Sequence, residues 1–212
     1  MKNKKCLIVA AAPENNLDYV REWIELYHPV IFCADDGLKH LKKLQIEPDW
    51  LIGDLDSISV PHTIHSKLLK LPCEKDEYDA QVCVRKAIEL GFRDLTLVCA
   101  SGGRIDHFLC NLSILEMAEE LGAKCQFLDH ENLIFFHPGG QQIYKRKNYR
   151  YVGIIPLDPV LTDVTLIGLK YPLSHGTLYR KHIISISNEP VDENFSIEIG
   201  SGKALVIFSE RQ

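Results

Sequence analysis

The sequence predicts an α/β fold in two parts. An N-terminal three-layer domain with a mostly parallel sheet is expected over residues 1–137, and a smaller C-terminal all-β, sandwich-like domain over residues 142–212. Two observations predict this division. In the first part, short apolar segments alternate with segments of helical periodicity, a pattern typical of parallel strands joined by crossover helices. In the second part, the segments are short, rich in β-branched residues and bounded by turn residues.

The apolar segments of the first domain are expected to be strands with both faces buried. Those strands are expected at residues 5–12, 30–35, 49–53, 94–100 and 124–136. Helices are expected between them, at residues 17–28, 37–45, 79–92 and 108–121. In the first helix, Val20, Trp23 and Tyr27 recur at the helical spacing. Asp79 marks the start of the third helix, and Gly91 marks its end.

The second domain follows the turn-forming residues 137–142. Its strands are expected at residues 150–157, 163–171, 182–189, 194–200 and 203–209. Helical periodicity does not occur in this part of the sequence, and short strands separated by turns favour a small sandwich or half-barrel.

Composition excludes several classes of partner. The formal net charge is −5 and the chain has no basic block, so we expect no binding to nucleic acid. Apolar stretches stay well short of the roughly 18 residues that cross a bilayer, so we expect no membrane association. The seven cysteines are scattered through apolar segments without a CxxC pair. This usage favours reduced core residues in a cytoplasmic protein over a disulfide framework or a zinc site.

Charged side chains of the first domain gather at the predicted ends of strands. Asp35 follows the second strand, Asp54 and Asp56 follow the third, and residues 101–107 follow the next strand along the chain. Asp79 opens the helix between the last two. In open α/β sheets, ligands bind just beyond the carboxyl ends of the strands. We therefore expect these groups to converge on one site.

Asp54 and Asp56 have two interpretations. In extended backbone, side chains at i and i+2 point to the same side, so both carboxylates would bind one hard cation such as Mg²⁺. An aspartate-rich turn capped by Ser57 explains the same residues without a metal. Asp79 is equally open, because an aspartate in the first turn of a helix often caps that helix.

Residues 101–107, with the sequence SGGRIDH, favour an anion site. The two glycines allow a close approach of the backbone, the helix N-terminus offers unpaired N–H groups, and Arg104 adds a guanidinium. Asp106 would either anchor Arg104 or reach a metal, and His107 would either bind the ligand or bond to backbone. Two glycines also suit an ordinary strand-to-helix turn, but the arginine and its acidic neighbours favour a polyphosphate.

Standard nucleotide signatures are missing from the sequence. It contains no GxxxxGK[ST] P-loop, and no GxGxxG follows the first strand. Residues 54–58, with the sequence DLDSI, resemble the DxDx[TV] motif of haloacid-dehalogenase-like phosphatases. The fifth residue is Ile58, however, and the motif follows the third strand instead of the first. An Mg²⁺-dependent phosphatase is therefore kept as an alternative.

Six motifs, in order along the chain, resemble the thiamine pyrophosphokinase family. They are ADDGLKHL (34–41), EPDWLIGDLDSI (47–58), EKDEYD (74–79), SGGRIDHFLCN (101–111), GLKYPL (168–173) and SISNE (185–189). The resemblance covers nearly the whole chain. It implies transfer of the diphosphate of ATP to the hydroxyl of thiamine, giving thiamine diphosphate and AMP, with Mg²⁺ as cofactor. It also implies a homodimer with thiamine at the subunit interface.

The resemblance further implies roles for individual residues. The catalytic and magnesium-binding carboxylates would be Asp54, Asp56 and Asp79. The nucleotide-binding residues would be Asp35, Gly102, Gly103, Arg104, Asp106, His107 and Asn111. The thiamine-binding residues would be Tyr171, Ser187 and Asn188. The first domain would bind ATP and Mg²⁺, and the second would bind thiamine and form the dimer.

Three residues depart from the family pattern. Asp36 replaces a glycine, Tyr78 replaces a threonine and Tyr171 replaces a tryptophan. The first two add charge or volume beside the expected nucleotide and metal, whereas the third keeps an aromatic face that can stack on a cationic ring. A non-catalytic nucleotide or thiamine sensor is therefore the second alternative. Release of AMP that depends strictly on thiamine would distinguish the enzyme from both alternatives.

Overall fold

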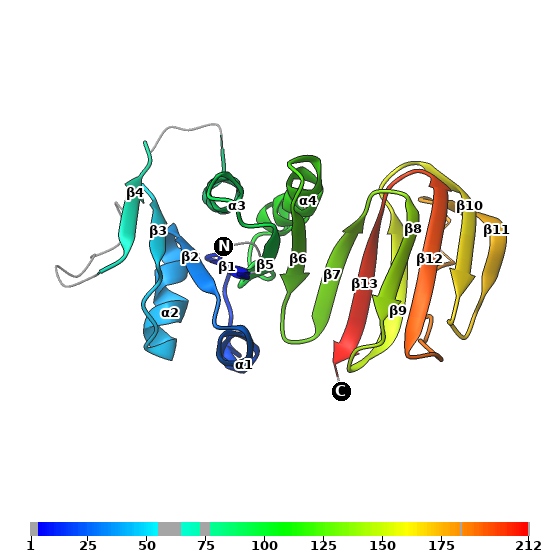
Figure 1. Ribbon diagram of the computed structural model, residues 1–212, viewed down its shortest axis with the longest axis horizontal. Helices are drawn as coiled ribbons and strands as arrows, with labels where there is room; N and C mark the ends of the chain where they lie inside the picture. Colours follow the sequence, from blue (N-terminus) through cyan, green and yellow to red (C-terminus); the bar gives the residue numbers. More distant parts are fainter. Residues whose placement is uncertain (1–3, 55–64, 73–76, 183, 212) are drawn as a thin grey trace. The chain divides into compact units, whose positions relative to one another are not determined.

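The computed structural model describes residues 4–54, 65–72, 77–182 and 184–211. The chain divides into two compact units, residues 1–130 and residues 131–212. The first unit contains the helices and a parallel sheet, and the second contains antiparallel strands (Figure 1). This architecture confirms the fold class that the sequence predicts.

The first unit is built on a parallel sheet. Its strands are β1 (Cys6–Val9), β2 (Val30–Ala34), β3 (Trp50–Gly53), β4 (Lys67–Lys70), β5 (Asp94–Val98) and β6 (Lys124–Leu128). Their order in the sheet is β4-β3-β2-β1-β5-β6, and every neighbouring pair is parallel. Leu7 and Ile8 of β1, Phe32 of β2 and Leu97 of β5 are fully buried, as expected when helices cover both faces.

Four helices and one short turn connect these strands. They are α1 (Asp18–Tyr27), the 3₁₀ turn η1 (Asp35–Gly37), α2 (Leu38–Leu44), α3 (Asp79–Glu89) and α4 (Ile105–Glu120). Figure 1 shows α1 and α2 on one face of the sheet and α3 and α4 on the other. The fourth helix begins at Ile105, earlier than predicted, so that His107 lies in its first turn.

Strand β1 marks the point where the strand order reverses. The chain adds β2, β3 and β4 on one side of β1, and β5 and β6 on the other. The loops after β1 and β5 therefore leave the sheet side by side. Ala10 N donates to Val98 O and Ala12 N donates to Cys99 O, both at 3.0 Å. Such a reversal opens a crevice at the carboxyl ends of the strands, which is where ligands bind in sheets of this kind.

Cysteines contribute to the core of the first unit. The cysteines within the described residues are free thiols, and all of them except Cys110 are buried. Burial raises the pKa of the Cys99 thiol and of the Cys125 thiol to about 12. These side chains therefore act as small apolar groups at neutral pH.

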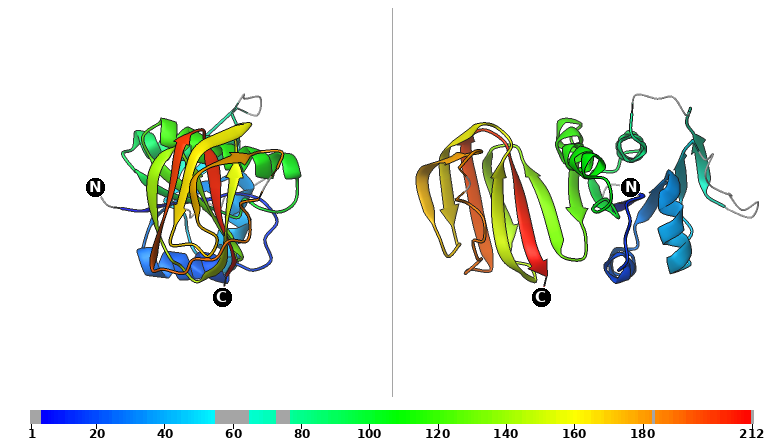
Figure 2. Two further views of the ribbon diagram at one scale, coloured as in Figure 1. Left: turned by 90° about the vertical axis from the view of Figure 1, so that its right-hand side faces the viewer. Right: turned by 180° about the vertical axis from the view of Figure 1, so that it is seen from behind.

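The second unit is a sandwich of two antiparallel sheets. Its strands are β7 (Asn132–His137), β8 (Gly140–Lys145), β9 (Tyr149–Pro156), β10 (Val160–Ile167), β11 (Leu173–Tyr179), β12 (Asn194–Ser201) and β13 (Ala204–Arg211). One sheet has the order β11-β10-β12-β8, and in the other β13 pairs with β7 and β9. The two sheets lie face to face (Figure 2).

Aromatic side chains fill the space between the two sheets. Phe208 of β13 has its ring centroid 6.1 Å from that of Tyr144 on β8 and 5.7 Å from that of Phe195 on β12. Tyr144 and Phe195 are themselves stacked at 5.5 Å. Because the contacts of Phe208 join strands of different sheets, this cluster forms the core of the sandwich.

One expectation about an individual strand was wrong. Residues 184–189 form one isolated bridge, between Val152 and Asn188, and Ser187 adopts a left-handed φ of 58° that interrupts extended backbone. Residues 124–136 were expected to form one or two strands, and they contribute to two, β6 and β7; the second of these, β7, pairs antiparallel with β13. Within the described residues, no helix is long and apolar enough to cross a membrane.

Candidate active site

A cavity of about 410 Å³ lies at the carboxyl ends of the parallel strands. It is lined by the loops after β1, β2 and β5 and by the starts of α3 and α4. The predicted site residues that line it are Asp35, Asp79, Gly102, Gly103, Arg104 and His107. Tyr78 and Asp36, two of the departures from the family pattern, line it as well. The structure therefore brings together three of the four segments that the sequence predicts at the site.

The turn η1 places two aspartates at the end of β2. Asp35 has a left-handed φ of 40°. Gly37 packs so tightly that a Cβ on it would lie 2.5 Å from Val9 O and 2.8 Å from Ala10 O. Only glycine allows this approach. The close contact between η1 and the end of β1 holds Asp35 and Asp36 at the cavity.

The end of β3 approaches Asp35 for a similar reason. A Cβ on Gly53 would lie 2.7 Å from Asp35 Oδ1, so the absence of a side chain at this position lets β3 pass beside that carboxylate. Asp54 follows Gly53 directly. Asp54 does not line the cavity in the part of the chain that the structure describes, and Asp56 lies outside the described residues.

The carboxylates around the cavity suit a hard cation. Among the described residues, no group of three or more His, Cys, Asp or Glu side chains forms a complete metal site. Mg²⁺ does not require one, because it is usually bound by one or two carboxylates together with waters and phosphate oxygens. Asp35, Asp36 and Asp79 place carboxylates at the cavity, and the oxygen donors present therefore fit magnesium.

The glycine-rich loop after β5 packs against the loop after β1. Gly102 and Gly103 have φ values of 83° and 67°. A Cβ on Gly103 would lie 2.8 Å from Pro13 Cδ, and one on Gly102 would lie 3.0 Å from Pro13 O. Both glycines are thus required by conformation and by space. Pro13 and the alanines before it line the cavity but were not predicted; the position of their loop at the strand-order reversal was the available signal.

Arg104 and Asp106 form a two-pronged ion pair. Arg104 Nη2 donates to Asp106 Oδ2 at 2.6 Å, and Nε donates to Oδ1 at 3.1 Å. The guanidinium lowers the pKa of Asp106 to about 2, so this carboxylate stays ionised at any ordinary pH. The structure shows Asp106 anchoring Arg104 and, through the His107 N–H at 3.0 Å, the start of α4.

His107 and Tyr78 contact each other across the cavity wall. The Tyr78 hydroxyl lies 3.2 Å from His107 Nδ1, and the two rings meet edge to face with centroids 5.1 Å apart. Burial and the nearby Asp79 carboxylate raise the pKa of Tyr78 above its ordinary value. The residue that replaces the family threonine therefore contacts a predicted nucleotide-binding residue.

Asn111 lies on the inner side of α4 and does not line the cavity. Its side chain is buried, and Nδ2 donates to Ala100 O at 2.8 Å. Its Oδ1 is buried without a hydrogen-bond partner among the described residues. The contact with Ala100 ties α4 to the loop that carries Gly102 and Gly103, so Asn111 supports the site from behind.

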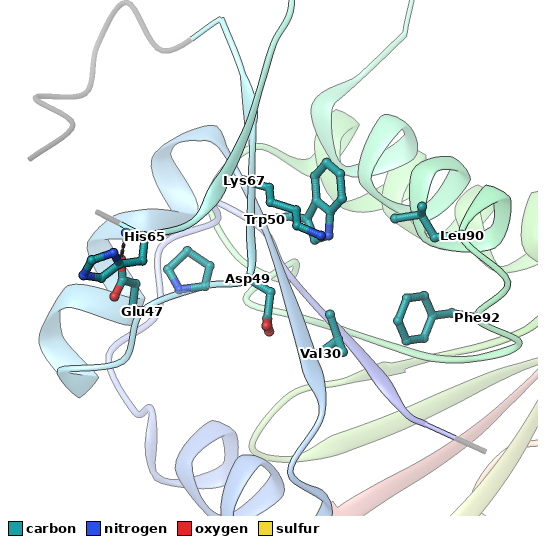
Figure 3. A pocket seen from close by; sticks show the side chains of 9 residues that line it. Val30, Glu47, Asp49, Trp50, His65, Lys67, Leu90 and Phe92 are labelled. Atoms are coloured by element: carbon teal, nitrogen blue, oxygen red, sulfur yellow. Dashed lines mark hydrogen bonds between the residues drawn. The ribbon is translucent and has the colours of Figure 1, made fainter. Parts of the chain in front are cut away.

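A larger cavity, of about 520 Å³, lies at the opposite end of the strands (Figure 3). Trp50, with Lys67 Nζ 5.1 Å from its ring centroid, forms one wall, and Asp49 and Glu47 contribute carboxylates. Asp49 Oδ2 accepts a hydrogen bond from Ile31 N at 2.8 Å, which is a structural role. Size alone does not identify a site. The smaller cavity is favoured because it combines carboxylates, glycine backbone and a guanidinium at the strand-order reversal.

The predicted thiamine-binding residues lie in the second unit. Tyr171 is exposed, and Asn188 is buried beneath its backbone. Asn188 Oδ1 accepts from Tyr171 N at 2.9 Å, and Nδ2 donates to Tyr171 O at 2.8 Å. Ser187 is exposed, next to Asn188. The structure therefore brings Tyr171 and Asn188 together and uses the amide of Asn188 for backbone contacts.

An open parallel sheet with carboxylates, a glycine-rich loop and an arginine at its reversal point is suited to the transfer of phosphate groups. Comparison with known proteins identifies the class further. Residues 24–127 match the family model described as thiamin pyrophosphokinase, catalytic domain. Residues 141–205 match the model described as thiamin pyrophosphokinase, vitamin B1 binding domain.

Curated relatives and solved structures agree with these matches. The thiamine pyrophosphokinase of Bacillus subtilis is 29% identical over 208 residues, covering 95% of this chain and 97% of that protein. Thiamin pyrophosphokinase 1 of Caenorhabditis elegans is 30% identical over 170 residues, covering 74% of this chain and 70% of that protein. The crystal structure from Bacillus subtilis has a TM-score of 0.88 at 26% identity and covers 98% of this chain and 99% of that one.

The yeast thiamin pyrophosphokinase structure shares the fold, with a TM-score of 0.81 at 15% identity, covering 99% of this chain and 87% of that one. The chain belongs to the thiamine pyrophosphokinase family.

Proposed function

We propose that this chain transfers the diphosphate of ATP to the hydroxyl of thiamine and releases thiamine diphosphate and AMP. The observation that carries the proposal is the cavity in which Asp35, Asp79, the glycine-rich loop and Arg104 meet, in a chain of this family. In such reactions the protein acts mainly by positioning the reactants and by stabilising charge.

Asp54, Asp56 and Asp79 are the proposed magnesium ligands and catalytic carboxylates. Bound Mg²⁺ would neutralise charge on the phosphate oxygens of ATP. One carboxylate of this set would accept the proton that the thiamine hydroxyl loses as it attacks the β-phosphorus. Asp35 lies beside Gly53, at the base of the segment that carries Asp54, and supports nucleotide binding from the end of β2.

The start of α4 is the proposed polyphosphate site. Its first N–H groups have no carbonyl partner within the helix and carry a partial positive charge. Gly102 and Gly103 expose further backbone, and Arg104, whose side chain is 70% exposed, supplies a guanidinium beside them. Asp106 orients Arg104, His107 faces the cavity, and Asn111 holds the helix against the loop.

The second unit is the proposed thiamine-binding and dimerisation domain. Tyr171 would stack on the cationic vitamin, Asn188 would fix the backbone of Tyr171, and Ser187 would contact the ring substituents. Large apolar side chains are exposed on this unit, which supports a homodimer. They are Ile143, Ile167, Ile184, Ile186 and Val191. The free, buried cysteines support a cytoplasmic location for the protein.

A product assay tests the function. Purified protein, ATP, Mg²⁺ and thiamine are incubated, and the products are separated by chromatography beside a control without thiamine. We expect equal amounts of AMP and thiamine diphosphate, and neither product without thiamine or after chelation of the metal. ADP with thiamine monophosphate would instead show transfer of the γ-phosphoryl group.

The two alternatives give different products. A phosphatase would release inorganic phosphate without thiamine. A sensor would be stabilised by ATP or thiamine in a thermal melt but would form no product. No specific contact within the described residues favours either alternative over the transferase.

A further inference from the structure

We infer that Tyr78 is a positioning residue that donates a hydrogen bond to His107 Nδ1, so that His107 keeps its ring proton on Nε2 and presents that N–H to a phosphate oxygen of the nucleotide. The inference rests on the proposed function, because that function brings a polyphosphate into the cavity. It assigns a role to a residue that differs from the threonine of the family pattern.

The geometry joins the starts of two helices. Tyr78 precedes the first residue of α3, and His107 lies in the first turn of α4. Both side chains line the cavity. The distance of 3.2 Å between the hydroxyl and Nδ1 is that of a hydrogen bond, and His107 Nε2 has no hydrogen-bond partner among the described residues.

The chemistry of the two groups determines the direction of this bond. A neutral imidazole has one N–H donor and one acceptor nitrogen, whereas a phenol donates or accepts. A phosphate oxygen offers only lone pairs, so the nitrogen that faces it must carry the proton. Nδ1 is then the acceptor, and the Tyr78 hydroxyl, which is protonated at neutral pH, is the donor within reach.

Tyr78 is held in place by contacts away from the cavity. Its N–H donates to Gln81 Oε1 at 3.2 Å, and its carbonyl accepts from Val82 N at 3.1 Å. Arg85 bonds to Glu77 at 2.6 Å and to Met117 Sδ at 3.7 Å, and so connects α3 to α4. Helix packing therefore sets the distance between Tyr78 and His107 before any ligand binds.

Nitrogen-15 NMR of the imidazole tests the tautomer directly. In the ligand-free wild-type protein we expect His107 to carry its proton on Nε2, with Nδ1 as the acceptor. Tyr78→Phe keeps the ring but removes the donor, so the two tautomers should then mix. A wild-type His107 with its proton on Nδ1 would overturn the inference. The wild-type spectrum alone determines the tautomer, so this test depends neither on enzymatic activity nor on the folding of a variant.

Kinetics test the consequence for the reaction. Tyr78→Phe should lower kcat for thiamine diphosphate about 3- to 10-fold, the value of one hydrogen bond. His107→Asn, with no donor near the Nε2 position, should lower kcat about 100-fold. His107→Gln, whose amide nitrogen reaches that position, should lower kcat less.

The double variant separates the two roles of Tyr78. In the His107→Gln background, Tyr78→Phe should not lower kcat further, because the glutamine has no tautomer for Tyr78 to fix.

Lys86→Met is the matched control, because it breaks the surface ion pair between Lys86 and Glu89 of α3 and changes neither the cavity nor the contacts of Tyr78. It should leave both the melting temperature and kcat close to the wild-type values, since a surface ion pair is worth little. An equal loss from Tyr78→Phe in the wild-type and His107→Gln backgrounds would reject the inference in favour of a purely structural tyrosine. An active wild-type protein with an Nδ1 proton would reject the inference and keep the function. An inactive protein with an Nε2 proton would reject the function and keep the hydrogen bond.

Discussion

The side-chain amide of Asn188 binds the backbone of Tyr171 at both of its polar groups, with Tyr171 N 2.9 Å from Oδ1 and Tyr171 O 2.8 Å from Nδ2. Asn188 is only 6% exposed, whereas Tyr171 is 60% exposed. A buried amide therefore fixes the backbone of a residue whose aromatic ring faces solvent. An amide supplies one acceptor and one donor, which matches the N–H and the carbonyl of Tyr171.

Asn188→Ala should weaken both the fold and thiamine binding. Two backbone groups of Tyr171 lose their partners, and we expect unfolding to become easier by about 1–3 kcal/mol. The KM for thiamine should rise while the KM for ATP stays unchanged. Urea denaturation and steady-state kinetics measure the two effects. Glu189→Gln is the control, since its ion pair with Lys170 lies at the surface and is worth little. An unchanged KM for thiamine would contradict a positioning role for Asn188.

Tyr171→Ala should raise the KM for thiamine without destabilising the protein, because the exposed ring has few contacts to lose. Stacking of a cation on an aromatic face is worth about 0.5–2 kcal/mol, which corresponds to a rise of several-fold. Tyr171→Phe keeps the face and should stay close to wild type. If the alanine variant bound thiamine normally in calorimetry, Tyr171 would lie outside the site.

Asp54→Ala and Asp79→Ala should each reduce turnover by at least about 10²- to 10³-fold, the usual cost of losing one group that stabilises transition-state charge. The fold should remain intact, because Asp54 directly follows β3 and Asp79 is the first residue of α3. Asp49→Asn, at the other end of β3, is the control: it alters the bond to Ile31 N and should affect stability more than turnover. A folded Asp54→Ala protein with normal activity would remove the metal interpretation.

Two buried histidines should make the protein less stable in acid. His40 Nε2 donates to Ala12 O at 2.8 Å, and His137 Nε2 donates to Ile197 O at 3.2 Å. Burial lowers the pKa of both imidazoles below the ordinary value. Below about pH 6.5 the unfolded chain therefore takes up protons that the folded protein resists. As the pH is lowered, the free energy of unfolding should decrease by at most about 1.4 kcal/mol per pH unit for each histidine.

Urea denaturation at pH 7.0, 6.0 and 5.5 measures this dependence. His137→Gln removes one titrating group and should reduce the slope. The exposed His175 works in the opposite direction, because Asp163 raises its pKa, but solvent screens that pair and its effect should be small. A slope that is equal in wild type and His137→Gln would show that His137 does not contribute.

Much of the first unit could be predicted because its strands are apolar on both faces and its helices have clear starts and ends. The convergence of Asp35, Asp79 and residues 102–104 followed from topology alone, since parallel strands end at one edge. The loop of Pro13 was missed because alanine and proline carry no chemical signal. Its role comes from its position beside the reversal of strand order, which depends on pairing between distant segments.

The second unit was harder to predict in detail. Residues 182–189 have the composition of a strand, yet Ser187 has left-handed backbone and only Asn188 forms a bridge to β9 within residues 184–189. In the first unit, strand β4 was not expected, because Lys67–Lys70 is short and lies at the edge of the sheet. The amide of Asn188 was assigned to ligand recognition by resemblance, and its backbone contacts became visible only in three dimensions.

Two neighbouring positions of the turn η1 differ in the side chains that they can accept. Asp36 is exposed and Gly37 is pressed against the carbonyls of β1. Gly37→Ala should displace the turn and abolish activity. Asp36→Gly should fold normally and change the affinity for ATP only slightly. The charge at the cavity can therefore change at position 36, whereas position 37 must remain glycine. The turn thus separates the residue that sets local charge from the residue that sets backbone shape.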